Sequence, residues 1–331
     1  MLAPAGLDLS RGEIAFFRQA DPWGFILFAR NIDTPDQVRA LTASLREAVG
    51  RDAPIFIDQE GGRVQRMRAP HWREWVPPWD EVARTPDPDR DQILALRYRI
   101  IGAELIDLGI DGNCVPCADI QTPDTHTFLA NRCLGSDAAT VARFAMTVAA
   151  AAARAGVLPV IKHMPGHGRA VTDSHLEVPR VTAGKALLKR QDFAVFRDLA
   201  YEPVGMTSHV IYEAFDDRPA TLSPVIIDLI RQDIGFAGLL MTDDISMGAL
   251  TGSIAQRSTA AIAAGCDLVL HCNGEMAEME AVVAATGRLT DAGQTRASAA
   301  LAAQKTRAAP GDIDVAELAA TYEQLVKGFN A

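Results

Sequence analysis

The chain has 331 residues, of which 48% are hydrophobic and 22% are charged, and its formal net charge is −10. This length can bury a large core, either as one barrel-sized domain or as two ordinary domains, and the composition is that of a globular protein. The acidic balance argues against a nucleic-acid partner, because a phosphate backbone requires a basic surface.

The ends and the apolar runs of the sequence carry no membrane or export signal that we can identify. The first residues lack a cationic start followed by an apolar stretch and a cleavage site, and every apolar run is far shorter than the ~18 residues that span a bilayer. The five cysteines are odd in number and have apolar neighbours, which favours buried free thiols in a reducing compartment. We therefore expect a cytoplasmic protein with no membrane partner.

Short apolar runs alternate along the chain with longer amphipathic segments. The predicted strands are residues 6–9, 24–28, 54–58, 113–117, 157–162, 204–209, 238–243 and 267–271. Among the predicted helices, residues 34–49 begin at a Thr34 cap with Pro35 in the first turn, and residues 136–156 run from a Ser136 cap to Gly156.

The predicted strands are almost wholly apolar, as expected for parallel strands that helices cover. Eight such strands alternating with helices predict an α/β fold, a TIM-type (β/α)8 barrel, in a single domain over residues 1–331. A doubly wound open sheet is the alternative, although no G-x-G-x-x-G follows the first clear strand.

Polar residues follow four of these strands where each strand ends. They are Asp58 to Arg63, Lys162 to Gly168, Ser208 with His209, and Asp243 with Asp244. In a TIM barrel the active site forms at the carboxyl ends of the strands, so these groups would converge on one rim. Packing alone does not explain four such ends.

Two pairs of residues point to acid–base chemistry, one at a strand end and one in the segment that follows Gly168. Asp243 and Asp244 are adjacent on a strand and so point in opposite directions, which allows one to face the barrel mouth while the other supports the loop or caps a helix, a role that suits Asp244 better. Asp173 lies two residues before His175, so in a turn its carboxylate can orient the imidazole; an ordinary surface turn is the alternative.

Other groups are open to two interpretations. Asp58 and Arg66 could bind the hydroxyls and a polar substituent of a sugar, or they could form a surface ion pair. The spacing of Cys114 and Cys117 occurs in redox and zinc sites, but no second pair completes such a site, which favours core packing. The tryptophans of the long loop could stack on a sugar or cover the outside of the barrel, and we favour the covering role; they are Trp72, Trp75 and Trp79.

Taken together, these segments resemble the β-N-acetylhexosaminidases of glycoside hydrolase family 3, which are bacterial enzymes of cell-wall recycling. The resemblance rests on several ordered motifs, namely residues 24–31, 57–66, 162–168, 172–175, 208–212, 217–220, 241–247 and 264–267. It implies a single barrel domain and a retaining mechanism. In that mechanism Asp243 would be the nucleophile and His175 the acid/base, with Asp173 completing a dyad.

The resemblance also implies which residues bind the substrate. Asp58, Arg66, Lys162 and His163 match positions that hold the sugar hydroxyls, and Arg132 aligns with a further sugar-contacting arginine although its flanking residues differ from the family pattern. The implied substrate is a small carbohydrate, an N-acetylglucosaminyl-anhydromuropeptide or a similar compound, cleaved without a cofactor or a metal by a monomer.

Three other functions remain as alternatives. A β-glucosidase of the same family is the nearest, although paired Asp243 and Asp244 favour N-acetyl specificity. A metal-dependent barrel hydrolase is suggested by the histidines near Asp243, but the first predicted strand has no His-x-His. A sugar-binding module without activity would keep Asp58 and Arg66 without the dyad.

Overall fold

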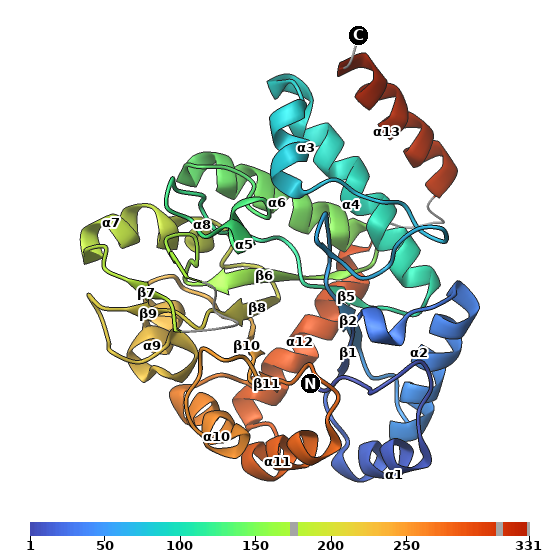
Figure 1. The fold of residues 1–331 in the computed structure, drawn as a ribbon, viewed down its shortest axis with the longest axis vertical. Coiled ribbons are helices and arrows are strands. Elements are labelled where there is room, and N and C mark those ends of the chain that lie inside the picture. Colours follow the sequence, from blue (N-terminus) through green and yellow to red (C-terminus); the bar gives the residue numbers. More distant parts are fainter. Residues whose placement is uncertain (173–177, 309–313, 330–331) are drawn as a thin grey trace.

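The computed structural model describes residues 1–172, 178–308 and 314–329, and its centre is a curled, wholly parallel sheet (Figure 1). Within those residues the sheet has seven strands in the order β1-β2-β5-β6-β8-β10-β11. The strands are β1 (Phe25–Leu27), β2 (Ile55–Ile57), β5 (Gly112–Asn113), β6 (Leu158–Met164), β8 (Val204–Thr207), β10 (Leu239–Asp244) and β11 (Leu268–Leu270). Four short strands form two small sheets, β3 (Gln59–Gly61) with β4 (Val64–Gln65), and β7 (Arg180–Val181) with β9 (Ile211–Tyr212).

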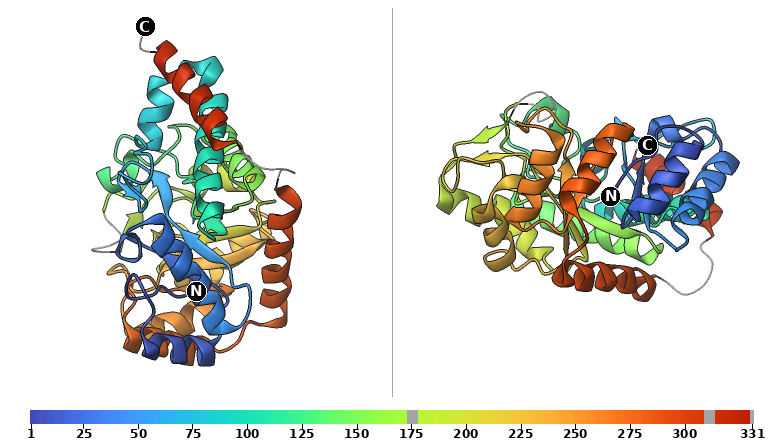
Figure 2. Two further views of the ribbon diagram at one scale, coloured as in Figure 1. Left: turned by 90° about the vertical axis from the view of Figure 1, so that its right-hand side faces the viewer. Right: turned by 90° about the horizontal axis from the view of Figure 1, so that it is seen from below.

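Helices surround the sheet on its outer side (Figures 1 and 2). They are α1 (Arg11–Ala20), α2 (Pro35–Val49), α3 (Pro78–Arg84), α4 (Arg90–Asp107), α5 (Thr127–Ala130), α6 (Ala138–Arg154), α7 (Lys185–Arg190), α8 (Asp192–Asp198), α9 (Pro224–Gln232), α10 (Ile254–Ala264), α11 (Met276–Thr286), α12 (Asp291–Arg307) and α13 (Val315–Phe329). None of the helices in the described part of the chain is both long enough and apolar enough to cross a membrane.

The two helices predicted in detail form, with one change at a cap. The side chain of Thr34 accepts a hydrogen bond from the amide of Gln37 at the start of α2, as its sequence predicts. At the start of α6 the cap is Asp137 rather than Ser136, because the Asp137 carboxylate accepts a hydrogen bond from the Thr140 amide at 2.9 Å. The prediction of a Ser136 cap is therefore wrong by one residue.

The prediction of a strand at residues 6–9 is also wrong. These residues form bends, and the side chain of Leu7 is 38% exposed, so the apolar spacing there does not mark a buried strand. The buried apolar residue nearby is Leu2, which forms a parallel bridge with Phe25 of β1.

Residues 1 and 2 lie between the first and the last strand of the sheet. On one side the amide of Leu2 donates to the carbonyl of Gly24, and on the other the nitrogen of Met1 donates to the carbonyl of Val269 at 2.7 Å. The amide of His271 returns a hydrogen bond to the carbonyl of Met1. A short segment thus makes backbone hydrogen bonds with both edge strands of the curled sheet.

The other seven predicted strands form, most of them shorter than predicted. The largest difference is at residues 113–117, where only Gly112–Asn113 pair as β5. Beyond that point Pro116 offers no amide, and its carbonyl accepts a hydrogen bond from Lys162 of β6 instead. The chain after β5 is therefore irregular, and in this irregular part the side chains of Cys117 and Asp119 lie next to β6.

The interior of the curled sheet is filled with apolar side chains, among them Phe56, Val160 and Met241. Helix α12 contributes Ala297 and Ala300 to the same cluster, so it closes the end of the sheet where the strands begin (Figure 1). The predicted packing role of the cysteines agrees with the structure, in which all five are free and only Cys272 is not fully buried. The open end of the sheet is therefore the one formed by the carboxyl ends of the strands.

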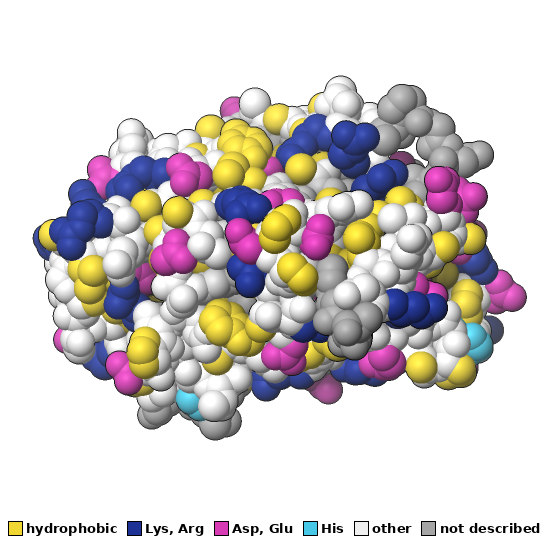
Figure 3. Space-filling view, turned by 90° about the horizontal axis from the view of Figure 1, so that it is seen from above, with side chains coloured by type: hydrophobic (Ala, Val, Ile, Leu, Met, Phe, Trp, Pro, Cys, Tyr) yellow, Lys and Arg dark blue, Asp and Glu magenta, His cyan; other side chains and the backbone are white. Residues whose placement is uncertain are grey.

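Charged side chains of both signs are interspersed on the face shown in Figure 3, with apolar side chains scattered singly between them. This distribution is that of an ordinary protein surface rather than of a basic stripe for a phosphate backbone.

Candidate active site

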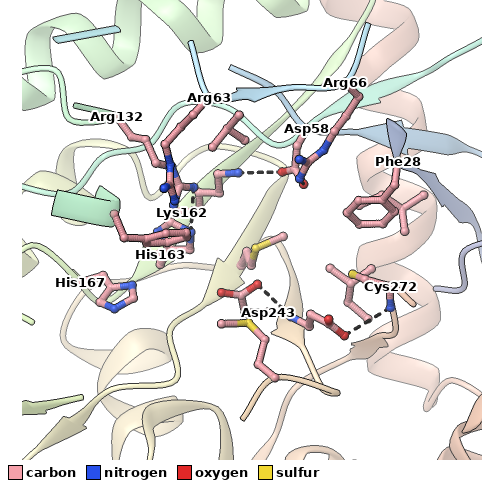
Figure 4. A pocket seen from close by; sticks show the side chains of 17 residues that line it. Phe28, Asp58, Arg63, Arg66, Arg132, Lys162, His163, His167, Asp243 and Cys272 are labelled. Atoms are coloured by element: carbon pink, nitrogen blue, oxygen red, sulfur yellow. Dashed lines mark hydrogen bonds and ion pairs between the residues drawn. The ribbon is translucent and has the colours of Figure 1, made fainter. Parts of the chain in front are cut away.

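A cavity of about 280 Å³ lies at the carboxyl ends of the strands (Figure 4). The side chains that line it are those of Ile26, Phe28, Asp58, Arg63, Val64, Arg66, Phe128, Arg132, Lys162, His163, His167, Met206, Asp243, Asp244, Met247, Leu270 and Cys272. Six of the predicted site residues are among them. They are Asp58, Arg66, Arg132, Lys162, His163 and Asp243.

The sheet itself brings most of these side chains together. Asp58 follows β2, Lys162 and His163 belong to β6, and Asp243 belongs to β10. Because parallel strands end at the same edge of a sheet, residues far apart in the sequence meet at this rim. The sequence-based expectation of a shared rim is met for these four residues.

Asp58 is the centre of an ion-paired group on one side of the cavity. Its Oδ1 lies 2.9 Å from the Lys162 ammonium, and its Oδ2 accepts a hydrogen bond from Arg66 Nη2 at 2.9 Å. Burial alone would raise the pKa of Asp58, but the positive charges of Lys162 and Arg66 outweigh that effect and hold the pKa well below its usual range. Asp58 is therefore an ionised acceptor whose position is fixed by two cations.

Glu60 is a functional residue that the sequence analysis missed. Its Oε1 lies 2.6 Å from Lys162 Nζ and 2.7 Å from Arg132 Nη2, and its Oε2 accepts from Arg132 Nε at 2.9 Å. Burial opposes ionisation of Glu60, yet Arg132 and Lys162 lower its pKa to about 2. Asp58 and Glu60 are two apart in the chain, a spacing that places side chains on one side of an extended backbone and could have indicated this pair.

Lys162 is consequently a buried cation with two anionic partners. Its side chain is 2% exposed, a position that would strongly disfavour an ammonium without compensation. Burial lowers its pKa, but Asp58 and Glu60 raise it further, so the net pKa lies above that of an ordinary lysine. Lys162 therefore does not reach solvent from the end of its strand.

His163 is oriented by Asp119, another residue that the sequence analysis missed. The Nδ1 of His163 lies 2.7 Å from Asp119 Oδ2, while Arg132 Nη2 lies 3.4 Å from its Nε2. Burial raises the pKa of Asp119, but His163 and His167 together lower it below its usual value, so Asp119 is an ionised acceptor and the proton lies on Nδ1 of His163. The Nε2 of His163 is then a hydrogen-bond acceptor whose one lone pair faces Arg132.

Cys117, Asp119 and His163 are the one group in the described part of the chain whose potential metal-ligand atoms lie close together, all within 4.8 Å. Their contacts are hydrogen bonds that already involve protons, since Cys117 Sγ donates to Asp119 Oδ2 at 3.3 Å. A hydrogen bond with Cys133, burial and the charge of Asp119 raise the pKa of the Cys117 thiol well above its usual value, and a metal ligand would have to be a thiolate. This group acts here to orient His163, and the absence of a metal requirement stays a prediction.

Asp243 faces the ion-paired group across the cavity (Figure 4). Its Oδ1 accepts a hydrogen bond from the amide of Asp244 at 2.8 Å. Burial raises the pKa of Asp243, but His163, His209 and this amide together lower it below the ordinary value, so the group is a carboxylate at neutral pH. The chemistry open to such a group is nucleophilic attack or stabilisation of a developing positive charge.

Asp244 has the different role that the alternation of the strand predicts. Its Oδ1 accepts from the amides of Ser246 and Cys272 at 3.1 and 3.2 Å, and its Oδ2 accepts from the Ser246 hydroxyl at 2.7 Å. Asp244 therefore supports the loop that follows β10, and Asp243 is left as the reactive candidate.

His209 fixes the backbone that carries both aspartates. Its Nε2 lies 2.9 Å from the carbonyl of Asp244, which can only accept, so Nε2 donates, and its Nδ1 lies 2.8 Å from Thr221 Oγ1. Burial lowers the pKa of His209 and keeps the ring neutral at neutral pH. His209 thus acts on Asp243 through the main chain.

The predicted dyad of Asp173 and His175 lies outside the described residues. The chain that leads to it is anchored next to α5, because the carbonyl of Gly168 accepts from Thr125 Oγ1 at 2.5 Å and the carbonyl of Ala170 accepts from the amide of His126 at 3.1 Å.

Two aromatic side chains that the sequence analysis did not select lie at the rim. Phe28 has the Arg66 guanidinium 5.1 Å from its ring centroid, and Phe128 has that of Arg63 at 3.9 Å. The described lining includes none of the three loop tryptophans. Trp75 instead packs against Tyr322 of α13, with ring centroids 5.2 Å apart, in agreement with the covering role that we favoured.

Comparisons with known proteins give a consistent result. Residues 18–304 match the model of the glycosyl hydrolase family 3 N-terminal domain. A β-hexosaminidase of Alkalilimnicola ehrlichii is 36% identical over 299 residues, which is 88% of this chain and 84% of that protein. The crystal structure of NagZ from Neisseria gonorrhoeae in complex with N-trifluoroacetyl-D-glucosamine has a TM-score of 0.86 and 26% identity, covering 98% of this chain and 97% of that one. A family 3 β-N-acetylglucosaminidase from Paenibacillus has a TM-score of 0.85 and 28% identity, covering 98% of this chain and 67% of that one.

The buried carboxylate of Glu60 leads to a prediction about stability and pH. In the unfolded chain a glutamate takes up a proton near pH ~4.3, whereas the folded protein holds Glu60 ionised down to about pH 2. Its contribution to the free energy of unfolding is therefore complete above pH ~5 and is lost as the pH falls toward 2. We expect Glu60→Gln to lower the free energy of unfolding by about 3 kcal/mol at pH 7, because two buried cations lose their shared anion.

The measurement is urea denaturation of both proteins at several pH values between 7 and 3. The difference between wild type and Glu60→Gln should narrow as the pH falls. A difference that stays constant over this range would show that Glu60 carries no shifted charge.

Proposed function

This chain belongs to glycosyl hydrolase family 3, and from that premise we propose that it is a retaining exo-β-N-acetylglucosaminidase that removes terminal N-acetylglucosamine from muropeptide fragments. The observation that carries the proposal is the arrangement of the cavity. A carboxylate, Asp243, lies on one side, and an ion-paired group that presents both acceptors and donors, Asp58 with Arg66 and Lys162, lies on the other.

In the proposed first step Asp243 attacks the anomeric carbon. A bond forms from its carboxylate oxygen to that carbon while the bond to the aglycone oxygen breaks, and His175 donates a proton to the departing oxygen. The lowered pKa of Asp243 supports this role, because a nucleophilic carboxylate must be ionised at neutral pH. In the second step water attacks the same carbon, gives its proton to His175, and releases Asp243.

A histidine in the acid/base role suits this chemistry. Its unperturbed pKa of ~6.5 allows both protonation and deprotonation near neutral pH, so no carboxyl group with a raised pKa is needed. Asp173 would orient the imidazole, as a carboxylate does in hydrolase triads.

The opposite side of the cavity would bind the sugar. Asp58 can accept from hydroxyl groups, and Arg66 and Lys162 can donate to hydroxyl oxygens. The Nε2 of His163 can accept a hydroxyl proton in exchange for its contact with Arg132, which is long at 3.4 Å. Arg132 would hold Glu60 and His163 in place at the rim. The NagZ complex with an N-acylated glucosamine supports an N-acetylglucosaminyl substrate.

The size of the cavity supports cleavage from the end of a chain. About 280 Å³ lies just below the range of roughly 300–1,000 Å³ for ligand pockets and suits one sugar residue better than several. The aglycone would then extend from the mouth toward solvent.

We extend the proposal to the architecture and setting of the protein. The hydrogen bonds of residues 1 and 2 to both edge strands support closure of the sheet as a TIM-type barrel, with this segment in the place of one strand. Packing of α12 and α13 against the rest supports one catalytic domain over residues 1–331. A monomeric, cytoplasmic enzyme of peptidoglycan recycling without a cofactor is the corresponding biological prediction.

The substrate class can be tested by comparing two chromogenic glycosides. We expect hydrolysis of nitrophenyl β-N-acetylglucosaminide with a kcat/KM at least about tenfold above that of the β-glucoside, since losing matched polar contacts costs several kcal/mol at a site built to bind them. Faster cleavage of the glucoside would favour the β-glucosidase alternative, and loss of activity on chelation would favour a metal-dependent hydrolase.

The nucleophile can be tested by trapping and by substitution. A fluorinated N-acetylglucosamine analogue should form a stable covalent adduct that peptide mapping places on Asp243, and Asp243→Asn should reduce kcat by a factor of about 10⁴ or more. Asp244→Asn is the matched control and should retain the ability to form the adduct. An adduct on any other residue would exclude the proposed mechanism.

The acid/base can be tested through the leaving group. His175→Ala should slow cleavage of glycosides with poor leaving groups by about 10²- to 10⁴-fold, because their oxygen needs a proton as the bond breaks, and should affect activated aryl glycosides much less. Equal losses for both kinds of substrate would remove His175 from this role.

A further inference from the structure

Helix α13 lies beyond residues 18–304, the part of the chain that the family model matches. It packs along α4 and beside α3, at the margin of the molecule (Figures 1 and 2). Its side chains nevertheless connect to the sugar-binding side of the cavity through a continuous set of buried polar contacts.

The contacts begin at Tyr322, which is 5% exposed. Its hydroxyl donates to Glu81 Oε2 at 2.8 Å and accepts from Arg84 Nη2 at 2.9 Å. Its ring packs edge-on against Trp75. Tyr322 therefore contacts both the long loop after β4 and the helix α3 that follows it.

The next contacts lead from Glu81 to Glu60. Arg97 Nη1 donates to Glu81 Oε2 at 2.9 Å, and both side chains are 0% exposed. Arg97 Nη2 then donates to the main-chain carbonyl of Glu60 at 2.7 Å, and Tyr98 donates to the same carbonyl at 3.0 Å. A Cβ atom at Gly61 would lie 1.9 Å from Arg97 Nη2, so the glycine there makes room for this approach.

Trp75 provides a second connection to the same hairpin. Its carbonyl accepts from the amide of Gly62 at 2.8 Å, and its amide donates to the side chain of Gln65 at 3.1 Å. Helix α13 is thus connected to the hairpin of β3 and β4 in two ways, through the ring contact of Tyr322 with Trp75 and through the hydrogen bonds of Glu81 and Arg97.

We propose that Tyr322 is a positioning residue for the sugar-binding side of the cavity, acting through Glu81, Arg97 and Glu60. The carboxylate of Glu60 holds Lys162 and Arg132, so a shift of its main chain moves both cations. Asp243 is carried by β10 and does not take part in these contacts. This inference rests on the proposed function and predicts a change in sugar binding with little change in the chemical step.

The test is the affinity for N-acetylglucosamine, measured by calorimetry, together with kcat and KM for its nitrophenyl glycoside. Tyr322→Phe removes the hydroxyl and keeps the ring packing on Trp75. We expect the Kd and the KM to rise roughly 2- to 30-fold, the range found for substitutions along coupled networks, with kcat changed less than about twofold. Glu81→Gln should give the same pattern and serves as the second variant should Tyr322→Phe fold poorly.

A double-mutant cycle separates positioning from a general loss of stability. If Tyr322 acts through Glu60, the effects of Tyr322→Phe and Glu60→Gln on the Kd should be clearly non-additive, although the two side chains do not touch. Leu318→Ala is the control on the same helix. It removes apolar packing without removing a hydrogen bond to Glu81, so it should lower the melting temperature and leave the Kd unchanged.

Additive effects, or an unchanged Kd in both Tyr322→Phe and Glu81→Gln, would overturn this inference and leave the proposed function intact. Failure of the wild-type protein to bind or hydrolyse an N-acetylglucosaminide would instead overturn the proposed function, and this inference with it.

Discussion

The buried ammonium of Lys162 is the group on which the rest of the site depends. A lysine at 2% exposure is stable as a cation only with close anionic partners, and here Asp58 and Glu60 supply two. These carboxylates in turn need further cations, which Arg66 and Arg132 provide. Lys162, Glu60 and Arg132 are buried at a cost that their partners offset, and Asp58 and Arg66 complete the group at the partly exposed side.

This mutual dependence ties the site to the fold. Lys162 is on β6, Asp58 follows β2, and Arg132 follows α5. The ion-paired group therefore joins three segments that are far apart in the sequence and meet only in the folded protein. The hydrogen bond of Asp119 to His163 adds a further link between the chain after β5 and β6. The geometry that would bind a sugar is thus also part of what holds the open end of the sheet together.

The two sides of the cavity differ in how their charges are held. Around Asp58 the charges are paired and fixed by side chains, whereas Asp243 has hydrogen bonding from the main chain and the neutral ring of His209 behind it. Among the described residues no cation pairs directly with Asp243, so this ionised carboxylate keeps an oxygen available for an incoming carbon atom. On the side of Asp58 the ion pairs fix the directions of the hydrogen-bond donors and acceptors, and such an arrangement suits binding of a sugar.

Strand-end polarity was sufficient to predict which residues meet, since Asp58, Lys162, His163 and Asp243 all follow or end apolar runs. Strand-end polarity placed Glu60 in the group after β2, but it did not show that Glu60 pairs with Lys162 and Arg132, which are distant in the sequence. Asp119 was in none of the strand-end groups, because its importance comes from its contact with His163. The apolar spacing at residues 6–9 predicted a strand because it is typical of one, whereas backbone hydrogen bonding at the sheet edge selected residues 1 and 2. The local sequence pattern thus predicted which strand ends form the site. The contacts between its side chains depend on residues that are distant in the sequence.

The interior of the sheet is packed with apolar side chains and closed at its far end by α12, which limits the routes by which molecules can enter and leave the cavity. With side chains filling the space beneath it, the cavity exchanges its contents through the mouth at the strand ends. In the proposed mechanism the departing aglycone and the incoming water would then pass through the same opening in succession. Steric occupancy alone would therefore protect a glycosyl intermediate until the first product has left, and the residence time of that product at the mouth would set how soon water can enter.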